Sequence, residues 1–199
     1  MNKNLKMLKV FFRVLKNNNE EIKRVLPNMY TKSFYDIDFN YLLEQGIKYL
    51  VIDIDGTILP PDIILVNQEL INKITELKEN FSIYLVSNNN LNRVKPVADI
   101  LDVAYLNNAS KPLPVAYQKI FKLLGEDNPS KIAMIGDQML SDIYGANAYN
   151  IYTVLVRPIS NHNNIGTYIN RKLQNKIEKY LKVKNYFDKD KYYKNRDEI

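Results

Sequence analysis

The sequence predicts an α/β fold in which a five-stranded parallel sheet is sandwiched by helices. Short apolar runs alternate with longer amphipathic segments between residues 48 and 156. The runs are continuously apolar, which is typical of parallel strands buried on both faces, and the intervals between them suit helical crossovers. The expected strands are Tyr49 to Ile54, Ile83 to Ser87, Val103 to Leu106, Ile132 to Gly136 and Tyr152 to Val156.

Helical crossovers are expected between these strands, because parallel strands cannot be joined by tight turns. Two crossovers carry apolar residues at helical spacing, and Gly125 supplies an end signal for the second. The apolar positions are Ile71, Ile74 and Leu77 in the first crossover, and Tyr117, Ile120, Phe121 and Leu124 in the second.

The chain is expected to divide into three parts. Residues 1–40 form a basic amphipathic N-terminal arm, which Pro27 interrupts. Residues 41–183 form the α/β domain, including a C-terminal helix from Asn164 to Val183. Residues 184–199 form a charged tail that is expected to fray.

The composition is that of a folded globular chain, with 46% hydrophobic and 25% charged residues. Cysteine is absent from the sequence, which excludes disulfides, thiolate metal sites and cysteine nucleophiles. The formal charge of +6 favours an anionic partner. No apolar run approaches the roughly 20 residues that span a bilayer, so a cytoplasmic protein is expected.

Polar residues that could take part in catalysis or bind a metal follow the predicted strands at their carboxyl ends, where open parallel sheets bind their ligands. Asp53 and Asp55 flank a single residue, so along an extended strand end their side chains point the same way. Together with Asp137 they form an oxygen-only cluster suited to Mg²⁺. Lys111 and the Ser87 hydroxyl can bind phosphoryl oxygens, and the set therefore predicts phosphoryl transfer.

Four motifs in order resemble those of the haloacid dehalogenase-like (HAD) superfamily. They are Asp53-x-Asp55-x-Thr57, Ser87, Lys111, and Gly136-Asp137 with Asp142. The resemblance covers roughly Lys48 to Pro158 and implies a Rossmann-like HAD fold. It also implies a phosphatase that forms an aspartyl phosphate.

The resemblance assigns a role to each motif residue. Asp53 would be the nucleophile, and Asp55 would protonate the leaving oxygen and then activate water. Asp53, the backbone carbonyl of Asp55, and Asp137 would hold Mg²⁺. Asp142 would contact these ligands without binding the ion directly, or would reach the ion through a water. Thr57 would help to position Asp55. The expected substrate-binding residues are Gly56, Ser87, Asn88 and Lys111.

A narrower resemblance is to the YqeG-like branch of HAD subfamily IIIA, which includes mitochondrial phosphatidylglycerophosphate phosphatases. It rests on four local signatures, and it implies a lipid phosphate as substrate. The intervals between successive motifs fit one crossover each, so no cap domain is expected and the site should be open to bulky substrates. The signatures are Ser87-Asn88-Asn89-Asn90, Lys111-Pro112, residues 136–142 and Asn170-Arg171.

The N-terminal arm suggests peripheral contact with an anionic membrane through residues 3–16. Its apolar and basic residues can occupy different faces of one helix, a pattern that also fits a helix packed on the domain. The apolar residues are Leu5, Leu8, Phe12 and Leu15, and the basic ones are Lys6, Lys9, Arg13 and Lys16.

Other interpretations of the same residues stay open at this point. Ser87 and the asparagines that follow it could cap a helix, Lys111 could be an exposed lysine, and Asp142 could simply accept backbone hydrogen bonds. The substrate could be a soluble nucleotide, sugar or protein phosphate. A receiver-like signalling module also uses an acceptor Asp with Mg²⁺. No motif indicates nucleic-acid binding, and none is expected.

Overall fold

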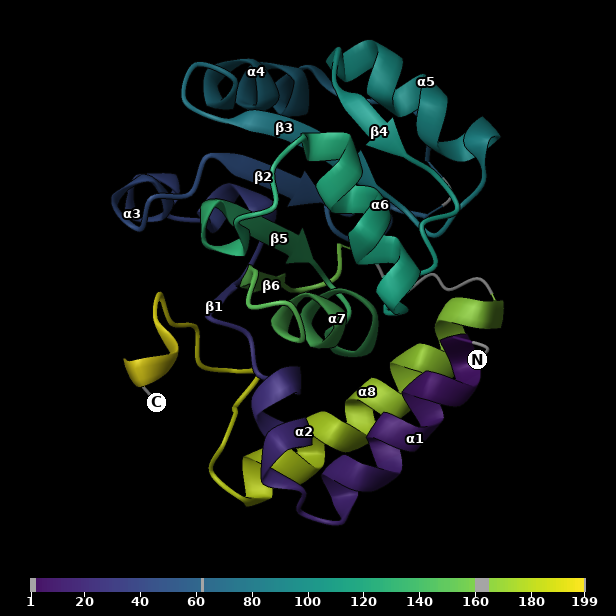
Figure 1. Cartoon of the computed structure of the whole chain (residues 1–199), viewed down its shortest axis with the longest axis vertical. Coiled ribbons are helices and arrows are strands. Elements are labelled where there is room, and N and C mark those ends of the chain that lie inside the picture. The colour runs from purple at the N-terminus through teal and green to yellow at the C-terminus, as the bar shows by residue number, and fades with distance from the viewer. Residues whose placement is uncertain (1–2, 62, 160–164, 199) are drawn as a thin grey trace.

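The computed structural model describes residues 3–61, 63–159 and 165–198 as an α/β domain around one parallel sheet (Figure 1). Six strands pair in the order β1-β6-β5-β2-β3-β4. Every pair is parallel. The strands are β1 (Met29–Thr31), β2 (Tyr49–Ile52), β3 (Ser82–Val86), β4 (Ala104–Leu106), β5 (Ile132–Gly136) and β6 (Tyr152–Val156).

The predicted fold class is confirmed, and all five predicted strands are present, with one further strand, β1. The first predicted strand ends at Ile52 rather than Ile54, because the Asp53 amide makes the last hydrogen bond to β5 and the Ile54 carbonyl already accepts from the turn that follows. β1 lies within the segment expected as an N-terminal arm and pairs with β6 at the sheet edge. Three residues are too few for a periodic pattern, which is why the sequence did not reveal this strand.

Helices cover the two faces of the sheet (Figure 1). They are α1 (Lys3–Leu15), α2 (Asn19–Val25), α3 (Phe39–Glu44), α4 (Gln68–Leu77), α5 (Leu91–Leu101), α6 (Pro114–Leu124), α7 (Tyr144–Asn147) and α8 (Ile165–Val183). Single turns occur at Phe34–Asp36, Pro129–Lys131, Met139–Ile143 and Arg196–Glu198. The C-terminal helix begins at Ile165 among the described residues, and Asn164, where it was expected to begin, lies outside them.

The side chains of the strands alternate between two apolar layers. In β2, Leu50 and Ile52 pack against α3, α4 and α5, whereas Val51 packs against α6 and α7. This period of two places successive side chains on opposite faces of the sheet. Because both faces are covered by helices, the central strands are buried throughout, as continuous apolar runs predict.

The two ends of the chain pack beside the sheet. Helices α1 and α8 lie side by side, and with α2 and the turn Met139–Ile143 they enclose a third apolar cluster (Figure 1). The tail, expected to fray, contributes the buried side chains of Phe187 and Tyr193 to this cluster. The backbones of Tyr193 and Tyr30 exchange two hydrogen bonds of 2.9 and 3.0 Å, so the tail covers the free edge of β1.

The connections near the site are short. Between β2 and β3 the described chain carries only α4, and between β3 and β4 only α5, so no cap domain lies over the carboxyl ends of the strands. Among the residues that the structure describes, no helix is both long and apolar enough to cross a membrane.

Candidate active site

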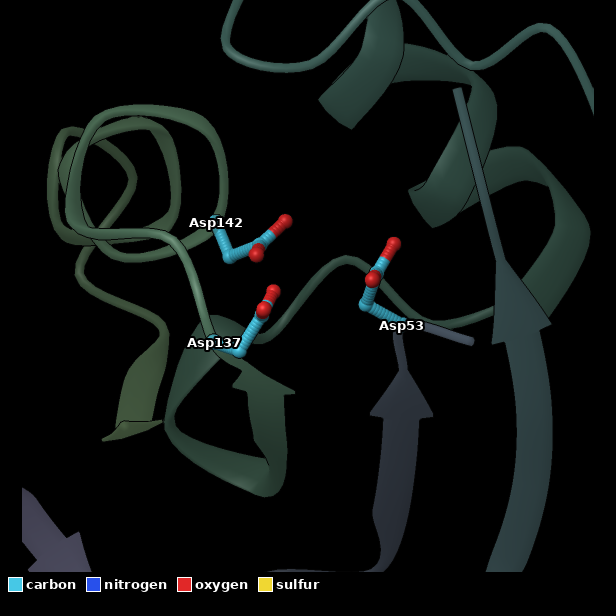
Figure 2. Close-up of side chains that lie close together, drawn as sticks. All are labelled: Asp53, Asp137 and Asp142. Carbon is cyan, nitrogen blue, oxygen red and sulfur yellow. The ribbon is translucent and has the colours of Figure 1, made fainter. Parts of the chain in front are cut away.

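Three carboxylates converge at the carboxyl ends of β2 and β5 (Figure 2). Asp53 follows β2, Asp137 follows β5, and Asp142 lies in the turn Met139–Ile143 that comes next. One oxygen of each carboxylate lies within 4.8 Å of the others, and all three residues are buried. Such a concentration of buried negative charge requires compensating cations.

Two glycines give the carboxylates room to approach the backbone. Gly56 adopts a φ of +87°, and a side chain there would overlap the Asp137 carboxylate. A side chain at Gly136 would overlap Asp142 in the same way. Gly56 is therefore needed both for its left-handed backbone and for the space above it.

The turn Met139–Ile143 brings Asp142 back toward the strand end. It is a single π-helical turn, and the Asp142 and Ile143 amides both donate to the Gln138 carbonyl, at 2.9 and 3.4 Å. The Gln138 amide donates to Asp142 Oδ2 at 3.2 Å. This wide turn directs the Asp142 side chain beside Asp137, a position that sequence spacing alone does not specify.

Lys111 supplies the main positive charge inside the cluster. Its ammonium group lies 2.7 Å from Asp53 Oδ1 and 2.8 Å from Asp142 Oδ1, and it donates to the Val86 carbonyl at 2.8 Å. Burial alone would lower the pKa of Lys111, but the charges of Asp142 and Asp53 outweigh it and raise the pKa above its ordinary value. Lys111 is therefore a buried, charged lysine rather than an exposed one.

Arg171 of α8 supplies a second positive charge. Its guanidinium forms an ion pair with Asp137 Oδ2 and donates to the Asp137 carbonyl at 3.3 Å. Burial raises the pKa of Asp137 to about 6, although Arg171 opposes the shift. Burial also raises the pKa of Asp53 well above its ordinary value, with Lys111 opposing. The two cations thus offset only part of the cost of burying three carboxylates.

The carboxylate cluster suits a divalent cation. Its donors are all oxygens, which Mg²⁺ prefers, and Asp137 Oδ1 is a buried acceptor without a hydrogen-bond partner among the described residues. A buried acceptor normally has a partner, so this oxygen is available to a ligand. The residues present therefore fit Mg²⁺, with side-chain oxygens from Asp53, Asp137 and Asp142.

The Asp55 side chain lies outside this cluster and has its own partners. Arg93 Nε donates to Asp55 Oδ1 at 2.8 Å, Arg93 Nη2 lies 2.7 Å from the same oxygen, and Asn89 Nδ2 donates to Oδ2 at 2.7 Å. The structure thus separates the two aspartates of the first motif. Asp53 belongs to the cation cluster, whereas Asp55 is held by residues that follow β3.

The residues after β3 hold the Lys111 loop in place. Asn88 Oδ1 accepts from the Lys111 amide at 2.7 Å, and Asn88 Nδ2 donates to the Lys111 carbonyl at 3.0 Å. The buried Ser87 hydroxyl accepts from the Asn89 amide at 3.0 Å. The buried Thr57 hydroxyl has no hydrogen-bond partner among the described residues, so the structure shows no contact through which it would position Asp55.

A family model described as mitochondrial PGP phosphatase matches residues 5–160. The chain belongs to this family. The probable phosphatase YqeG of Bacillus subtilis (strain 168) is 31% identical over 163 residues, which cover 81% of this chain and 94% of that protein. The chain is a HAD-type phosphatase of the YqeG-like branch, as its motifs predict.

Solved structures of HAD proteins are more distant. The putative HAD-hydrolase YfnB from Bacillus subtilis, in a magnesium-bound form, has a TM-score of 0.46 and 14% identity over 60% of this chain and 91% of that chain. A putative HAD subfamily III A hydrolase from Legionella pneumophila has a TM-score of 0.41 and 19% identity over 72% of this chain and 96% of that chain.

Three polar residues at this candidate site were not predicted as site residues. Asn89 and Arg171 stand in sequence signatures that resemble the YqeG-like branch, but the signatures alone do not indicate which side chains they contact. Arg93 lies in the first turn of α5, where an arginine is ordinarily solvated. The available signal was its position just beyond β3, which pairs with β2, the strand that Asp55 follows.

Proposed function

We propose that this phosphatase is a Mg²⁺-dependent phosphomonoesterase that works through an aspartyl phosphate on Asp53. The observation that carries the proposal is the buried cluster of Asp53, Asp137 and Asp142 within 4.8 Å of one another, with the Lys111 ammonium in contact with Asp53. A structural role alone does not account for three buried carboxylates, because apolar side chains of similar size would avoid their desolvation.

The proposed reaction has two steps. In the first, an Asp53 carboxylate oxygen bonds to phosphorus while the bond to the leaving oxygen breaks, and Asp55 gives that oxygen its proton. In the second, Asp55 takes a proton from water, the water oxygen bonds to phosphorus, and the bond between phosphorus and Asp53 breaks. The products are an alcohol and inorganic phosphate, and both aspartates return to their starting states.

The other residues stabilise the charge that is transferred. Lys111, whose ammonium contacts Asp53, would attract phosphoryl oxygens there, and Asn88 hydrogen-bonds the Lys111 backbone. When bound, Mg²⁺ would neutralise phosphoryl charge and orient the phosphoryl group toward Asp53. The ligands proposed for it are Asp53, Asp137, Asp142 and the backbone carbonyl of Asp55. Gly56, Ser87 and Asn88 stay proposed contacts of the phosphoryl group, and Thr57 a proposed partner of Asp55.

Asp53→Asn tests the covalent step. Turnover of a phosphate monoester should fall by orders of magnitude, and acid-stable incorporation of labelled phosphate into the protein should be lost. The parent enzyme should release many equivalents of phosphate per chain with Mg²⁺ and few with EDTA. Substantial turnover by the variant would contradict the mechanism, and a single long-lived adduct without turnover would favour a receiver-like switch instead.

We also propose a lipid phosphate, such as phosphatidylglycerophosphate, as the substrate. Family membership and the absence of a cap over the described site support a bulky substrate. Three consecutive apolar side chains, Ile63, Ile64 and Leu65, are exposed in the loop that follows the first motif. Phosphate release from this lipid in mixed micelles should exceed release from soluble sugar, nucleotide and peptide phosphates. Equal or faster release from a soluble ester would refute the lipid assignment.

Helix α1 supports peripheral contact with an anionic membrane. One face, which includes Met7 and Val14, is buried, while Leu8 and Phe12 stay exposed by 41% and 53% on the other face. Lys9 and Lys16 are exposed next to this apolar stripe. The arrangement has the charge and the apolar surface that bind anionic bilayers.

Vesicle flotation tests the membrane contact. A double variant, Leu8→Gln with Phe12→Gln, should reduce flotation with vesicles rich in phosphatidylglycerol, and the parent should float poorly with phosphatidylcholine alone. Leu91→Gln, which changes a similarly exposed residue of α5, is the matched control. Equal flotation of the double variant and the parent would exclude this face as the membrane contact.

A further inference from the structure

Arg93 connects the side chain of Asp55 to the loop that carries it. We propose that Arg93 is a positioning residue that aims the Asp55 carboxyl for proton transfer to the leaving oxygen. The inference rests on the proposed function, because it takes Asp55 to be the acid and base of the reaction. It assigns to α5 a part in catalysis that none of the four motifs contains.

The contacts of Arg93 are directed at one carboxylate and one loop. Nε and Nη2 both approach Asp55 Oδ1, at 2.8 and 2.7 Å. Nη1 donates to the Ile63 carbonyl at 2.8 Å and Nη2 to the Pro60 carbonyl at 3.0 Å. One planar guanidinium thus binds the Asp55 side chain and, a few residues further along, the backbone of the same loop.

The contacts of Asp55 complete this arrangement. Asn89 donates to Oδ2, so both carboxylate oxygens have a donor and the rotation of the carboxylate is fixed. The Asp55 and Arg93 side chains are only 15% and 11% exposed, which limits the competition of water for these bonds. The Thr57 hydroxyl makes no hydrogen bond among the described residues, which leaves Arg93 and Asn89 as the groups seen to orient Asp55.

The arrangement fits a positioning role better than a purely structural ion pair. Helix α5 already has its own cap, in which Asn90 accepts from the Arg93 amide, so the Arg93 side chain is not needed to begin the helix. The Arg93 side chain instead extends away from its own helix to the catalytic loop. General acid catalysis requires a proton donor held within hydrogen-bond reach of the leaving oxygen, about 2.6–3.2 Å between heavy atoms.

The inference predicts a dependence on the leaving group. A proton from Asp55 matters when the leaving oxygen is a poor leaving group, as in an alkyl phosphate, and matters little for 4-nitrophenyl phosphate. The kcat/KM reports the steps through release of the first product, so it isolates the acid role from the later hydrolysis of the aspartyl phosphate. A merely structural defect would lower kcat/KM for both substrates by the same factor.

The test compares Arg93→Met and Asp55→Asn on glycerol 1-phosphate and 4-nitrophenyl phosphate, with Mg²⁺ present. General acid catalysis contributes roughly 10²- to 10⁴-fold, so misdirection of the acid should lower kcat/KM for the alkyl ester by about 10- to 100-fold. The loss for the aryl ester should be within about threefold. Arg93→Lys keeps one charged contact to Asp55 and should recover part of the alkyl activity.

The outcomes separate the inference from the proposed function. Equal losses on both substrates in Arg93→Met and Arg93→Lys, together with a leaving-group dependence in Asp55→Asn, would overturn the positioning role alone. If Asp55→Asn itself shows no leaving-group dependence, the acid role of Asp55 fails and the inference fails with it. Lys95→Met, an exposed change on the same helix, should leave both substrates unaffected and is the matched control. If Arg93→Met does not fold, Arg93→Lys decides.

Discussion

Replacing Lys111 by methionine removes the positive charge at the centre of the carboxylate cluster while nearly preserving the length of the side chain. In the protein, the Lys111 ammonium contacts both Asp53 and Asp142, and all three side chains are at most 9% exposed. The variant leaves two of the carboxylates without this partner, and Arg171 contacts only Asp137. Removing one partner of a buried ion pair destabilises by about 3–5 kcal/mol.

That loss should depend on pH and on Mg²⁺. Burial already raises the pKa of Asp53 above its unfolded value, and without Lys111 the pKa rises further. A carboxyl group whose pKa is higher in the folded protein than in the unfolded chain destabilises the fold least at a pH below its unfolded pKa. The free energy of unfolding then falls as the pH rises toward the folded pKa. The defect should therefore shrink by up to about 1.4 kcal/mol per pH unit on acidification. Saturating Mg²⁺ should also restore stability, by about 2.7 kcal/mol at a concentration of 100 Kd.

Urea unfolding of the metal-free protein at pH 8 measures the effect, with and without added Mg²⁺. Lys119→Met, an exposed change on α6, is the matched control and should stay within about 0.5 kcal/mol of the parent. An unfolding free energy for Lys111→Met within about 1 kcal/mol of the parent would refute the view that Lys111 compensates a charged cluster. So would a defect that does not change with pH.

Three further predictions concern Gly56, Asp137 and Tyr193. Gly56→Ala should abolish Mg²⁺ binding measurable by calorimetry, because the added methyl group would overlap the Asp137 carboxylate. Binding as tight as in the parent would contradict this. Since the pKa of Asp137 is about 6, protons compete with the cation, and Mg²⁺ affinity should rise between pH 5 and 7; a flat profile would place the ion elsewhere. Tyr193→Ala should destabilise by about 3 kcal/mol in urea, because a buried ring is lost, whereas exposed Tyr192→Ala should cost less.

Most of the fold was predictable because the sequence shows its apolar pattern directly. The runs that form β5 and β6 begin and end where expected, since Lys131 and Asp137 bound the first and Arg157 follows the second. β1 could not be predicted, because three residues carry no period and their burial depends on pairing with β6, which lies more than a hundred residues away. Burial of Tyr193 in the tail likewise depends on Tyr30.

The sequence by itself determined the order of the motifs, the strand end on which each motif lies, and hence the family and the class of reaction. Only the tertiary structure decided the partners: Asp142 joins Asp53 and Asp137, whereas Asp55 turns to Arg93 and Asn89. The physical reason is that strand periodicity fixes which residues reach an edge of the sheet, whereas rotamers, a π-helical turn and a glycine with positive φ fix which side chains meet there.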